Sequence, residues 1–360
     1  MDKKDIKLIG SGWSAAGFIK NIDSSKFNVT IISNNPNFIY TPLLAYQIIK
    51  NINTKRFIKD IGNINYIRAT INNVDFNNNK LLCENGKEIS YDKVIFAHGS
   101  KVNTFNIKGV DENCLFLKTS DDADLIKKKL EMLPDNSNVT VIGCGLTGSE
   151  IIGNLIDMNK FNINAVDGLS KPLTIFDEKI QDYTMNLWEK NGINFFFNNF
   201  VSQIDSKEVY INHNKKSIPS DLNIWCGGIK TSPLSSIINK NLELNCRFGI
   251  PINNYLVIDT PKYNNIFAMG DCAYSKDPPT AQKAFQQGKY LAYCFNNDFK
   301  DIEPFKFQNR GQIGYIGKGE SVFQLGKFYS YGKLTGIFNK FVHLYNSIDY
   351  KQFMNFHTLF

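Results

Sequence analysis

Two segments of the chain carry the same pattern: an apolar strand, a glycine-rich turn and a helix. The first begins at Ile6 and reads IKLIGSGWSAAGFIKNI, and the second begins at Val139 and reads VTVIGCGLTGSEIIGNLI. A second apolar run follows each of them, at residues 29–33 and 163–167. A strand, a helix and a second strand in this order form a right-handed crossover between parallel strands. The duplication predicts an α/β protein with two Rossmann-like, three-layer nucleotide-binding domains.

Three further segments extend these two units. Residues 91–100 and 222–229 read as buried strands with a glycine near the end, and residues 264–273 read as a short strand that closes in Gly-Asp. Residues 121–133 combine charged and apolar positions at helical spacing, which predicts an amphipathic helix at the crossover between the domains. The Asn-rich stretch 72–80 predicts a hairpin turn.

The composition is typical of a soluble globular protein, with 42% hydrophobic and 21% charged residues. The formal charge of +7 is scattered without a Lys/Arg block, which argues against a nucleic-acid partner and favours a role in solubility over an acidic partner. No run of about 18 apolar residues is present, so we expect no membrane-spanning helix. The N-terminal residues lack the apolar segment of a targeting signal, so we expect none.

The glycines of the two turns are spaced as in dinucleotide-binding sites. The first turn reads Gly10-x-Gly12-x-x-Ala15, and the second reads Gly143-x-Gly145-x-x-Gly148. The first glycine allows the tight bend, the second lets the backbone approach a pyrophosphate, and the third small residue lets helix and strand pack closely. The phosphates then lie at the helix N-terminus, where free N–H groups and the helix dipole favour anions. Each motif alone is weak, but two in the correct context predict two nucleotide sites.

The residue that ends the second strand of each unit indicates which nucleotide is bound. In the second unit this residue is Asp167, whose carboxylate would accept from both ribose hydroxyls and repel a 2′-phosphate, which favours NADH over NADPH. The alternative is a solvated loop aspartate. In the first unit the strand ends in Ser33 rather than an acid. Asp271, after a buried strand, fits an acid that binds the ribityl chain of FAD. The alternative is a helix N-cap, and both roles are compatible because a helix is expected to start within residues 278–288.

With these features the chain resembles the type II NADH:quinone oxidoreductases, the single-subunit, non-proton-pumping NADH dehydrogenases. The most diagnostic pieces are Gly12-Trp13, Thr41-Pro42-Leu43-Leu44 and Ala281-Gln282-x-Ala284-x-Gln286-Gln287-Gly288. The resemblance continues in chain order through residues 94–110, 141–150, 224–234 and 266–292, and covers nearly the whole chain. These enzymes belong to the FAD-dependent pyridine nucleotide oxidoreductases, so the resemblance implies FAD and NADH as cofactors and a quinone as acceptor.

The resemblance also implies a set of site residues. Those that would line FAD are Gly10, Gly12, Trp13, Ser14, Ser33, Thr41, Pro42, Gly99, Gly270 and Asp271. Those that would line NADH are Gly143, Gly145, Leu146, Thr147, Gly148, Asp167 and Gly227. The catalytic set would be Glu150 beside the flavin, with Gln282, Gln286 and Gln287 between flavin and quinone. Ser33 agrees with this family, whereas Asn34-Asn35 replaces its usual Pro-Arg and His98 replaces its usual Thr or Val.

The order of the two sites predicts the domain limits. The FAD-binding domain would comprise residues 1–117 and 251–318, with an NADH-binding domain of residues 118–250 inserted in it. Residues 319–360 would form a C-terminal segment for membrane association or dimerisation.

The implied reaction is hydride transfer from NADH to flavin N5, followed by two-electron reduction of a quinone at a membrane surface. The alternative is a soluble acceptor, as in ferredoxin reductases or the apoptosis-inducing-factor-like enzymes. The seven cysteines form no C-x-x-C or C-x-x-x-x-C pair, which argues against a disulfide reductase and against a zinc or other metal site. A sulfide:quinone reductase stays open, because distant cysteines can meet in a fold.

The C-terminal residues 334–348 predict an amphipathic helix. Its apolar stripe would be Leu334, Ile337, Phe338, Phe341, Val342, Tyr345 and Ile348, and its polar side Asn339, Lys340, His343 and Asn346. Such a helix can lie in the headgroup plane of a membrane, and the aromatic-rich residues 349–360 would extend the contact. The alternatives are packing on the protein's own core or on a second subunit of a homodimer. The family resemblance favours a peripheral protein on the NADH-facing side of a membrane.

Overall fold

The computed structural model describes residues 3–348, and the side chains of residues 3–345. The chain forms two compact units. Unit 1 comprises Met1–Ile39, Lys55–Lys101 and Ile229–Asn309, and unit 2 comprises Tyr40–Thr54, Val102–Gly228 and Arg310–Phe360. Each unit therefore contains one of the two glycine-rich turns.

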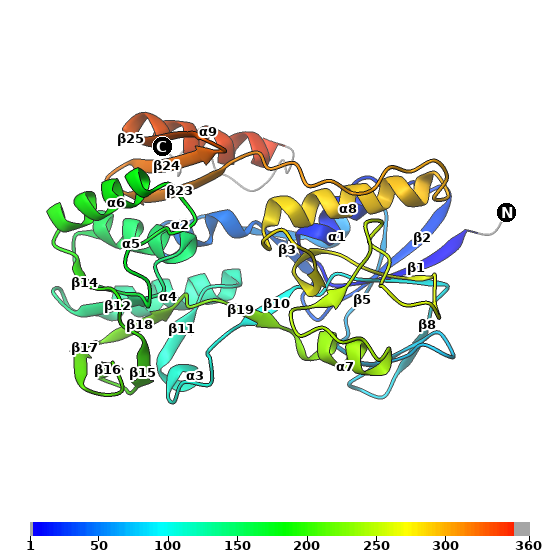
Figure 1. The fold of residues 1–360 in the computed structure, drawn as a ribbon, viewed down its shortest axis with the longest axis horizontal. Helices are drawn as coiled ribbons and strands as arrows, with labels where there is room; N and C mark the ends of the chain where they lie inside the picture. Colours follow the sequence, from blue (N-terminus) through cyan, green and yellow to red (C-terminus); the bar gives the residue numbers. More distant parts are fainter. Residues whose placement is uncertain (1–2, 349–360) are drawn as a thin grey trace. The chain divides into compact units, whose positions relative to one another are not determined.

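A five-stranded parallel sheet forms the centre of unit 1 (Figure 1). Its strand order is β21 (Ile266–Ala268), β9 (Lys93–Phe96), β1 (Lys4–Ile9), β2 (Phe27–Ile32) and β5 (Asn65–Ile67). In β1, Leu8 lies opposite Ile31 of β2 on one side and Ile95 of β9 on the other. The chain leaves β1 toward β2 and returns later to β9, so the strand order reverses beside β1. Open α/β sheets bind their ligands at such a reversal.

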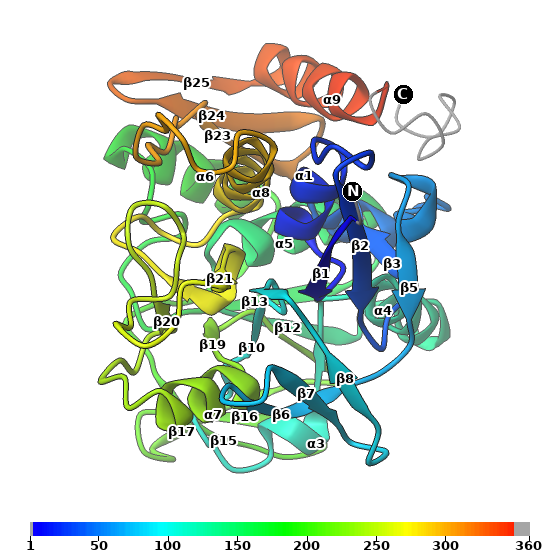
Figure 2. The ribbon, with the colours of Figure 1, turned by 90° about the vertical axis from the view of Figure 1, so that its right-hand side faces the viewer.

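Two helices, α1 (Trp13–Ile19) and α8 (Ala281–Asn296), pack against each other on one face of this sheet (Figure 2). Two glycines allow their close approach. A Cβ on Gly17 would lie 2.3 Å from the carbonyl oxygen of Phe285, and one on Gly288 would lie 2.0 Å from that of Ser14. The Gln-Gln-Gly motif therefore ends in a glycine because any side chain at Gly288 would push the two helices apart.

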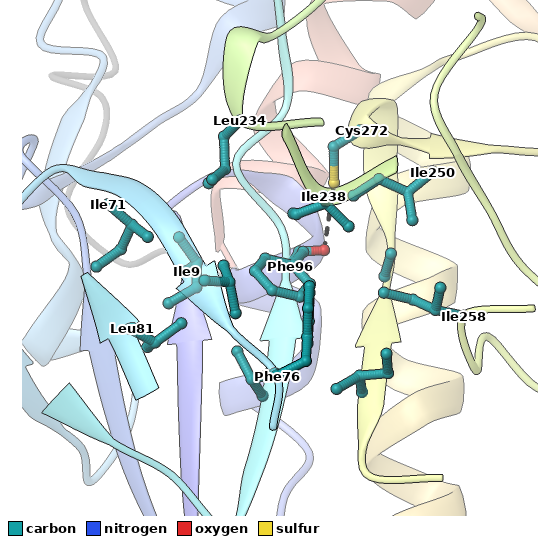
Figure 3. Close-up of a cluster of buried hydrophobic side chains, with 14 of the residues drawn as sticks. Ile9, Ile71, Phe76, Leu81, Phe96, Leu234, Ile238, Ile250, Ile258 and Cys272 are labelled. Atoms are coloured by element: carbon teal, nitrogen blue, oxygen red, sulfur yellow. Dashed lines mark hydrogen bonds between the residues drawn. The ribbon is translucent and has the colours of Figure 1, made fainter. Parts of the chain in front are cut away.

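The opposite face of the sheet carries a hydrophobic core (Figure 3). It is covered by β6 (Ile71–Asp75), β7 (Lys80–Cys83), β8 (Glu88–Ser90) and α7 (Pro233–Asn241). Phe76, Leu81 and Ile238 are buried against Phe96 of the sheet. β6 and β7 pair antiparallel, which confirms the hairpin predicted for the Asn-rich stretch.

Unit 2 repeats the topology of unit 1. The order of its parallel sheet is β11 (Cys114–Phe116), β18 (Leu222–Trp225), β12 (Asn138–Ile142), β13 (Asn162–Val166) and β14 (Asn194–Phe196). β12 takes the place of β1, β13 that of β2, and β18 that of β9. An antiparallel sheet lies in sequence between β14 and β18, as β6 to β8 lie between β5 and β9 in unit 1. It is formed by β15 (Val201–Ile204), β16 (Glu208–Ile211) and β17 (Lys216–Pro219). The predicted duplication is confirmed.

A second sheet in unit 2 is antiparallel and lies near the C-terminus. Its strands are β23 (Gln312–Gly317), β24 (Glu320–Leu325) and β25 (Phe328–Gly332), and α9 (Lys333–Ile348) follows them. Figure 1 shows α5 (Leu146–Met158) and α6 (Glu178–Lys190) between this sheet and the parallel one. A Cβ on Gly153 of α5 would lie 2.6 Å from the backbone nitrogen of Gly317, so this glycine allows α5 to pack on β23. The sheet was not among the predicted elements.

The remaining elements are short, with one exception in unit 2. In unit 1 they are β3 (Asn37–Ile39), β4 (Lys55–Phe57), η2 (Ile58–Asp60), β19 (Ile229–Thr231), β20 (Ile250–Pro251), η3 (Gly270–Cys272) and β22 (Ala273–Tyr274). In unit 2 they are η1 (Thr41–Leu43), α2 (Leu44–Gln47), α3 (Val110–Asn113) and the longer α4 (Ser120–Met132), while β10 (Ser100–Val102) spans the chain position where one unit passes into the other. Among residues 3–348, no helix is long and apolar enough to cross a membrane.

Candidate functional site

The first glycine-rich turn joins β1 to α1 in unit 1. Gly10 has a φ of +114°, and a Cβ there would lie 2.3 Å from the carbonyl oxygen of Ala97, just past β9. Ala15, at the third position of the motif, is fully buried. Gly12 differs from both, because no heavy atom within residues 3–348 lies less than 4 Å from the place of its Cβ. Packing within the protein therefore explains the first and third positions, whereas the second faces open space that a ligand can fill.

The second turn, between β12 and α5 in unit 2, has the same geometry. Gly143 has a φ of +92°, and a Cβ there would lie 2.7 Å from the carbonyl oxygen of Cys226. A Cβ on Gly148 would lie 1.9 Å from the carbonyl oxygen of Gly143. Gly145, like Gly12, is exposed and meets no described atom within 4 Å of its Cβ position.

Both helices begin at these open glycines. Gly12 is the N-cap of α1 and Gly145 is the N-cap of α5, and in the described part of the chain neither N-cap has a side-chain hydrogen bond. The first N–H groups of each helix are thus available to an anion, which the helix dipole also favours. The two turns therefore fit two dinucleotide pyrophosphates, one in each unit.

Asp167 follows β13 and is tied to the second turn. Its Oδ2 accepts from the backbone N–H of Cys144 at 2.6 Å, and its Oδ1 accepts from that of Leu169 at 2.8 Å. The carboxylate is half-buried and held beside the pyrophosphate cradle, where the ribose of a dinucleotide belongs. This position favours the ribose interpretation of Asp167 over that of a solvated loop residue.

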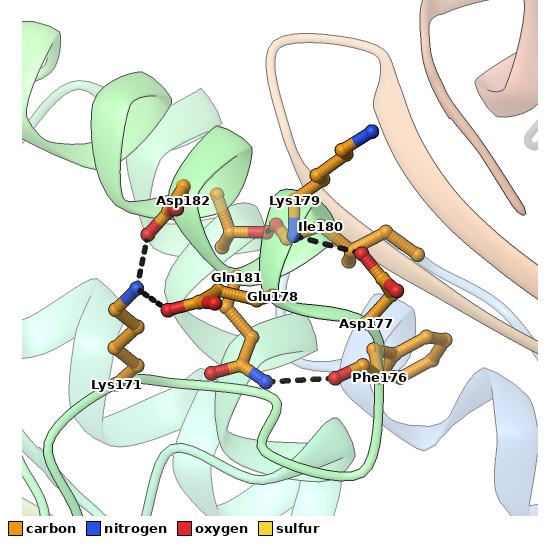
Figure 4. A network of polar contacts seen from close by, with 9 residues as sticks. Lys171, Phe176, Asp177, Glu178, Lys179, Ile180, Gln181 and Asp182 are labelled. Atoms are coloured by element: carbon orange, nitrogen blue, oxygen red, sulfur yellow. Dashed lines mark hydrogen bonds and ion pairs between the residues drawn. The ribbon is translucent and has the colours of Figure 1, made fainter.

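The loop after Asp167 contains a lysine that two acids hold (Figure 4). Nζ of Lys171 lies 2.8 Å from Oε1 of Glu178 and 2.6 Å from Oδ1 of Asp182, both on α6. These carboxylates raise the pKa of Lys171, so its charge is retained and directed toward α6. Each exposed pair contributes little stability, so their clearer effect is on the direction of the lysine.

Ser33, at the end of β2, organises the adjoining loop. Its hydroxyl lies 3.3 Å from that of Ser11 and accepts from the backbone N–H of Asn35 at 3.2 Å. Ser11 also donates toward the carbonyl oxygens of Asn35 and Asn37, at 3.0 and 3.1 Å. Ser11 was not predicted as a site residue, although its place inside the Gly-x-Gly turn is a usable signal.

Gly270 and Asp271 lie beside the first turn within unit 1. Gly270 has a φ of +73°, and a Cβ there would lie 2.7 Å from Oγ of Ser14. Oδ2 of Asp271 accepts from Oγ of Ser100 at 3.2 Å. The N-cap of α8 is Thr280, so the N-cap alternative for Asp271 at that helix is wrong.

The three predicted glutamines of α8 have different surroundings. Gln287 is buried, and its Oε1 accepts from the backbone N–H of Gly270 at 2.8 Å. The amide of Gln286 is engaged twice with the backbone of Gln308, at 2.9 and 3.0 Å. Gln282 is half-buried in the first turn of α8. The amides of Gln286 and Gln287 therefore hold backbone groups within unit 1.

Other predicted residues are distributed over both units. Trp13 begins α1 and packs edge-on against Phe38 at 5.0 Å, between ring centroids. Gly99 has a φ of +70° just past β9. Thr41 and Pro42 form η1 and belong to unit 2. The remaining members of the NADH set lie at the second turn: Leu146 and Thr147 open α5, and Gly227 follows β18, with its Cβ position 2.7 Å from the Trp225 ring.

Glu150 lies in the first half of α5 and is 8% exposed. Burial raises its pKa to about 8, against a smaller lowering effect of the Tyr315 backbone N–H, which donates to the carboxyl group. Glu150 therefore carries a proton at neutral pH. A buried carboxylic acid of this kind can deliver a proton in a reaction.

Two histidines in buried surroundings also titrate unusually. Burial, assisted by Lys101, lowers the pKa of His98 to about 4, and Nε2 of His98 lies 2.9 Å from Oγ of Ser235. Burial lowers the pKa of His343 in α9 to about 4 as well. Both imidazoles are neutral at neutral pH. The ring of His98 packs edge-on against Phe96, and this contact favours a packing role for His98.

Lys283 in α8 is a buried lysine, influenced by Asp271, that sequence reasoning did not single out. It is 2% exposed, and its Nζ donates to Oγ of Ser275 at 2.9 Å and to the carbonyl of Asp277 at 2.7 Å. Burial lowers its pKa, and the charges of Asp271 and Asp277 oppose that effect. A lysine within the otherwise uncharged stretch 281–288 was the available signal.

The seven cysteines are all free thiols. Burial raises the pKa of Cys226 and of Cys272 to about 12, and raises that of Cys144 well above its ordinary value. Thiols in this state are protonated and poor nucleophiles. The environment of these cysteines thus favours packing over thiol chemistry.

Comparison with known proteins identifies the family of the chain. Residues 4–288 match the family model described as pyridine nucleotide-disulphide oxidoreductase. The chain is 30% identical to a probable NADH dehydrogenase of Dictyostelium discoideum, over 91% of this chain and 82% of that protein. It is 25% identical to the mitochondrial external NADH-ubiquinone oxidoreductase 2 of Saccharomyces cerevisiae, over 94% and 76% of the two chains. The solved structure of NDH2 from Plasmodium falciparum in complex with NADH has a TM-score of 0.89 and 25% identity, over 96% and 95% of the two chains.

Two Rossmann-like units, each with an open glycine cradle, and this match over residues 4–288 define a flavin- and nicotinamide-dependent oxidoreductase: the chain belongs to the pyridine nucleotide-disulphide oxidoreductase family. Within that family it is a type II NADH dehydrogenase, with FAD and NADH as cofactors. The resemblance stated from the sequence is confirmed, as is the predicted α/β class.

Proposed function

We propose that the chain oxidises NADH and passes two electrons through FAD to a quinone at a membrane surface. The observation that carries this proposal is the pair of cradles at Gly12 and Gly145, because they offer two dinucleotide sites in one chain. Relatives named NADH-ubiquinone oxidoreductases support a quinone as acceptor. Bound FAD would take a hydride from NADH and release two electrons, while the protein supplies orientation and a dry site.

The proposed cofactor contacts follow the two turns. FAD would be held by Gly10, Gly12, Trp13, Ser14, Ser33, Gly99, Gly270 and Asp271 of unit 1. Thr41 and Pro42, also in the predicted FAD set, belong to unit 2, and their part in FAD binding stays a prediction. NADH would be held by Gly143, Gly145, Leu146, Thr147, Gly148, Asp167 and Gly227 of unit 2. The N–H groups of each turn bind the phosphates, Asp271 accepts from the ribityl hydroxyls, and Asp167 accepts from the adenosine ribose.

NADH is the proposed nucleotide rather than NADPH. Asp167 would repel a 2′-phosphate, and Lys171, the first basic residue after it, is engaged with Glu178 and Asp182. A 2′-phosphate would therefore meet a fixed carboxylate and a lysine directed elsewhere.

Glu150 is the proposed proton donor. Its carboxyl group is buried and protonated at neutral pH, so it can give a proton to the reduced acceptor. Gln282 would face the acceptor. Gln287 would support Asp271 from behind through Gly270, and Gln286 would fix the backbone at Gln308.

The surface of α9 supports membrane association. Thr335, Asn339 and His343, from the polar side of the helix, are 0–4% exposed and face the rest of unit 2. The apolar stripe is directed outward, with exposed fractions of 82% at Leu334, 50% at Ile337, 48% at Phe338, 53% at Phe341 and 77% at Tyr345. Nδ2 of Asn339 donates to Oγ of Ser321 at 3.1 Å, which fixes this orientation. These five side chains are therefore not buried in the core of unit 2, although Phe338 also packs edge-on against Phe323 at 5.5 Å between ring centroids.

An exposed apolar helix face of this kind fits the headgroup region of a bilayer. Leu325, Phe328 and Tyr331 of β24 and β25 add further exposed apolar side chains in the same C-terminal segment of unit 2. The predicted contributions of the Asn346 and Ile348 side chains and of residues 349–360 lie outside the described residues. We infer that the chain binds peripherally, on the side where NADH is available.

Vesicle flotation tests the membrane proposal. In full-length protein, Ile337→Ser, Phe338→Ser and Phe341→Ser together should abolish flotation and reduction of a long-tailed quinone, while turnover with a short-chain quinone persists. The matched control is Leu125→Ser with Met132→Ser, which removes two exposed apolar side chains of α4. A monomeric triple variant that still floats would remove the helix as the anchor, and loss of a dimer instead of flotation would assign the face to a second subunit.

The second candidate, a soluble acceptor, rests on no separate feature of the structure. It would be favoured by wild-type protein that oxidises NADH with a soluble one-electron acceptor but reduces neither quinone.

A further inference from the structure

We propose that Tyr46, Tyr315 and Asp157 carry protons from the surface of unit 2 to Glu150. The proposal rests on the proposed function, in which Glu150 protonates the reduced quinone. It adds the route by which Glu150 regains its proton, and all four residues belong to unit 2.

The two ends of the route lie on one face of α5. Glu150 and Asp157 are seven residues apart, so they lie on the same side of the helix and roughly 10 Å apart along its axis. Glu150 is 8% exposed, whereas Asp157, in the last turn of α5, is exposed to solvent. One carboxyl group is thus sealed within the protein and the other exchanges protons with water.

Tyr315 of β23 contacts both carboxyl groups. Its backbone N–H donates to the carboxyl group of Glu150, and its hydroxyl donates to Oδ2 of Asp157. The side chain is 5% exposed, so a buried phenol is hydrogen-bonded to the surface acid. Gly153, between the two acids on α5, lets the strand approach the helix this closely.

Tyr46 of α2 lies beside Tyr315. Its ring centroid is 5.3 Å from that of Tyr315, and the side chain is 4% exposed. Burial raises the pKa of Tyr46, and Glu150 is the charged neighbour that raises it most, followed by Tyr315 and Asp157. Tyr46 is therefore in electrostatic contact with every other member of the route.

Two tyrosines suit this task because a phenol both accepts and donates a hydrogen bond. It can take a proton on one side and release one on the other without a net charge. Burial also raises the pKa of Tyr315, so neither tyrosine ionises at neutral pH and neither stops the transfer as a phenolate. The route would conduct protons while its interior stays neutral.

The reaction needs one external proton in each turnover. NADH + H⁺ + quinone gives NAD⁺ + quinol, so the hydride supplies two electrons and one proton and the solution supplies the other. The O–H bond of Glu150 breaks as the new O–H bond of the quinol forms. Water then protonates Asp157, and one proton moves from Asp157 to Tyr315, one from Tyr315 to Tyr46 and one from Tyr46 to the Glu150 carboxylate, each phenol accepting a proton as it releases its own.

The neighbouring titratable groups do not interrupt the route. His343 of α9 packs edge-on at 6.1 Å from Tyr46 and is neutral, because burial lowers its pKa to about 4. The backbone N–H of Lys318 donates to Oδ1 of Asp157 at 2.8 Å, and the ammonium group of Lys50 is close enough to interact with Asp157. Glu320, the acid next to β23 that also influences Tyr315, hydrogen-bonds Tyr183.

The experiment uses full-length, FAD-loaded enzyme and three variants: Tyr315→Phe, Tyr46→Phe and Asp157→Asn. The asparagine still accepts the tyrosine hydrogen bond but cannot carry the proton. The matched control is Tyr183→Phe, which removes a phenol bound to the Glu320 carboxylate at 2.5 Å in the same unit. Turnover is measured with a short-chain quinone, which takes up protons, and with ferricyanide, which takes electrons alone.

We expect the three variants to lose quinone turnover about tenfold, and increasingly so toward alkaline pH, because reprotonation of Glu150 becomes limiting. The solvent deuterium isotope effect on kcat should rise in each. Ferricyanide turnover and the rate at which NADH bleaches the flavin should match wild type. Imidazole should rescue Asp157→Asn, because the lost acid is exposed to solvent, and Tyr183→Phe should behave as wild type.

Equal losses with quinone and ferricyanide would overturn the relay and assign the tyrosines a structural role, and so would an unchanged pH profile and isotope effect. If wild-type enzyme reduces ferricyanide but no quinone, the proposed function fails, and the relay fails with it because no proton is consumed. If wild type reduces quinone and the variants equal Tyr183→Phe, the relay alone fails.

Discussion

The backbone N–H of Gly270 donates a hydrogen bond of 2.8 Å to Oε1 of Gln287. This bond is buried, and it fixes the residue before Asp271 against the second turn of α8. A glutamine that sequence resemblance places between flavin and acceptor thus uses its amide oxygen to hold the proposed ribityl-binding turn.

Gln287→Leu should therefore weaken FAD binding. The substitution keeps the volume but leaves the Gly270 N–H without its acceptor, which costs about 1–3 kcal/mol. We expect FAD affinity to fall on the order of tenfold, and up to a hundredfold, as measured by flavin fluorescence during dilution.

The control for this variant is Asn239→Leu. Nδ2 of Asn239 donates to the carbonyls of Cys246 and Gly249 at 2.8 Å each, elsewhere in unit 1. It should lower Tm by a similar amount without changing FAD affinity. Equal loss of FAD from both variants would mean that general destabilisation, rather than the Gly270 turn, releases the cofactor.

The duplicated sheets could be predicted from the sequence because their determinants are local. Gly10 and Gly143 mark the turn that follows the first strand of each glycine-rich motif. The apolar runs around them have the period and length of buried parallel strands. The helix predicted at 121–133 is observed at Ser120–Met132, where Thr119 and Asp122 form a capping box. The predicted domain limits stay a prediction.

The β23–β25 sheet was missed because its signal depends on a distant partner. Gly314 and Gly317 break the apolar pattern of β23, and their role is to admit α5: Cβ atoms there would meet Leu146 at 2.4 Å and Gly153 at 3.2 Å. Tyr46 and Tyr315 were missed for the same reason, since 269 residues separate them in sequence. The direction of the apolar stripe of α9 likewise depends on what buries Asn339.

The four turn glycines should separate folding from binding. Gly10→Ala and Gly143→Ala place a Cβ at positive φ and within 2.7 Å of a backbone atom, so each should lose about 2 kcal/mol of stability or more. Gly12→Ala and Gly145→Ala meet no described atom within 4 Å, so the folded protein should keep its Tm when measured without cofactors. Gly12→Ala should lose FAD, and Gly145→Ala should keep FAD but raise the KM for NADH. The assignment of the two cradles is reversed if Gly145→Ala is the colourless variant.

Nucleotide preference should depend on Asp167 and on the acids that hold Lys171. Wild type should favour NADH in kcat/KM. Asp167→Ser should relax this preference, and adding Glu178→Gln with Asp182→Asn should move it further toward NADPH, because Lys171 then becomes available to a 2′-phosphate. Glu178→Gln with Asp182→Asn alone is the control and should leave NADH preferred. Equal use of both nucleotides by wild type would remove Asp167 as the determinant.

Stability should depend on pH through Glu150. Burial raises its pKa from 4.5 to about 8, so between these values the folded chain holds a proton that the unfolded chain releases. The free energy of unfolding contributed by this group therefore falls as pH rises from about 4.5 to about 8 and is level above that, a change on the order of 5 kcal/mol. Glu150→Gln still accepts the Tyr315 N–H but has no proton to lose. We expect the Tm of wild type to fall relative to that of Glu150→Gln across this window, with all other groups cancelling in the difference. A difference in Tm that stays constant with pH would mean that Glu150 is already ionised at neutral pH, and would remove it as the proton donor.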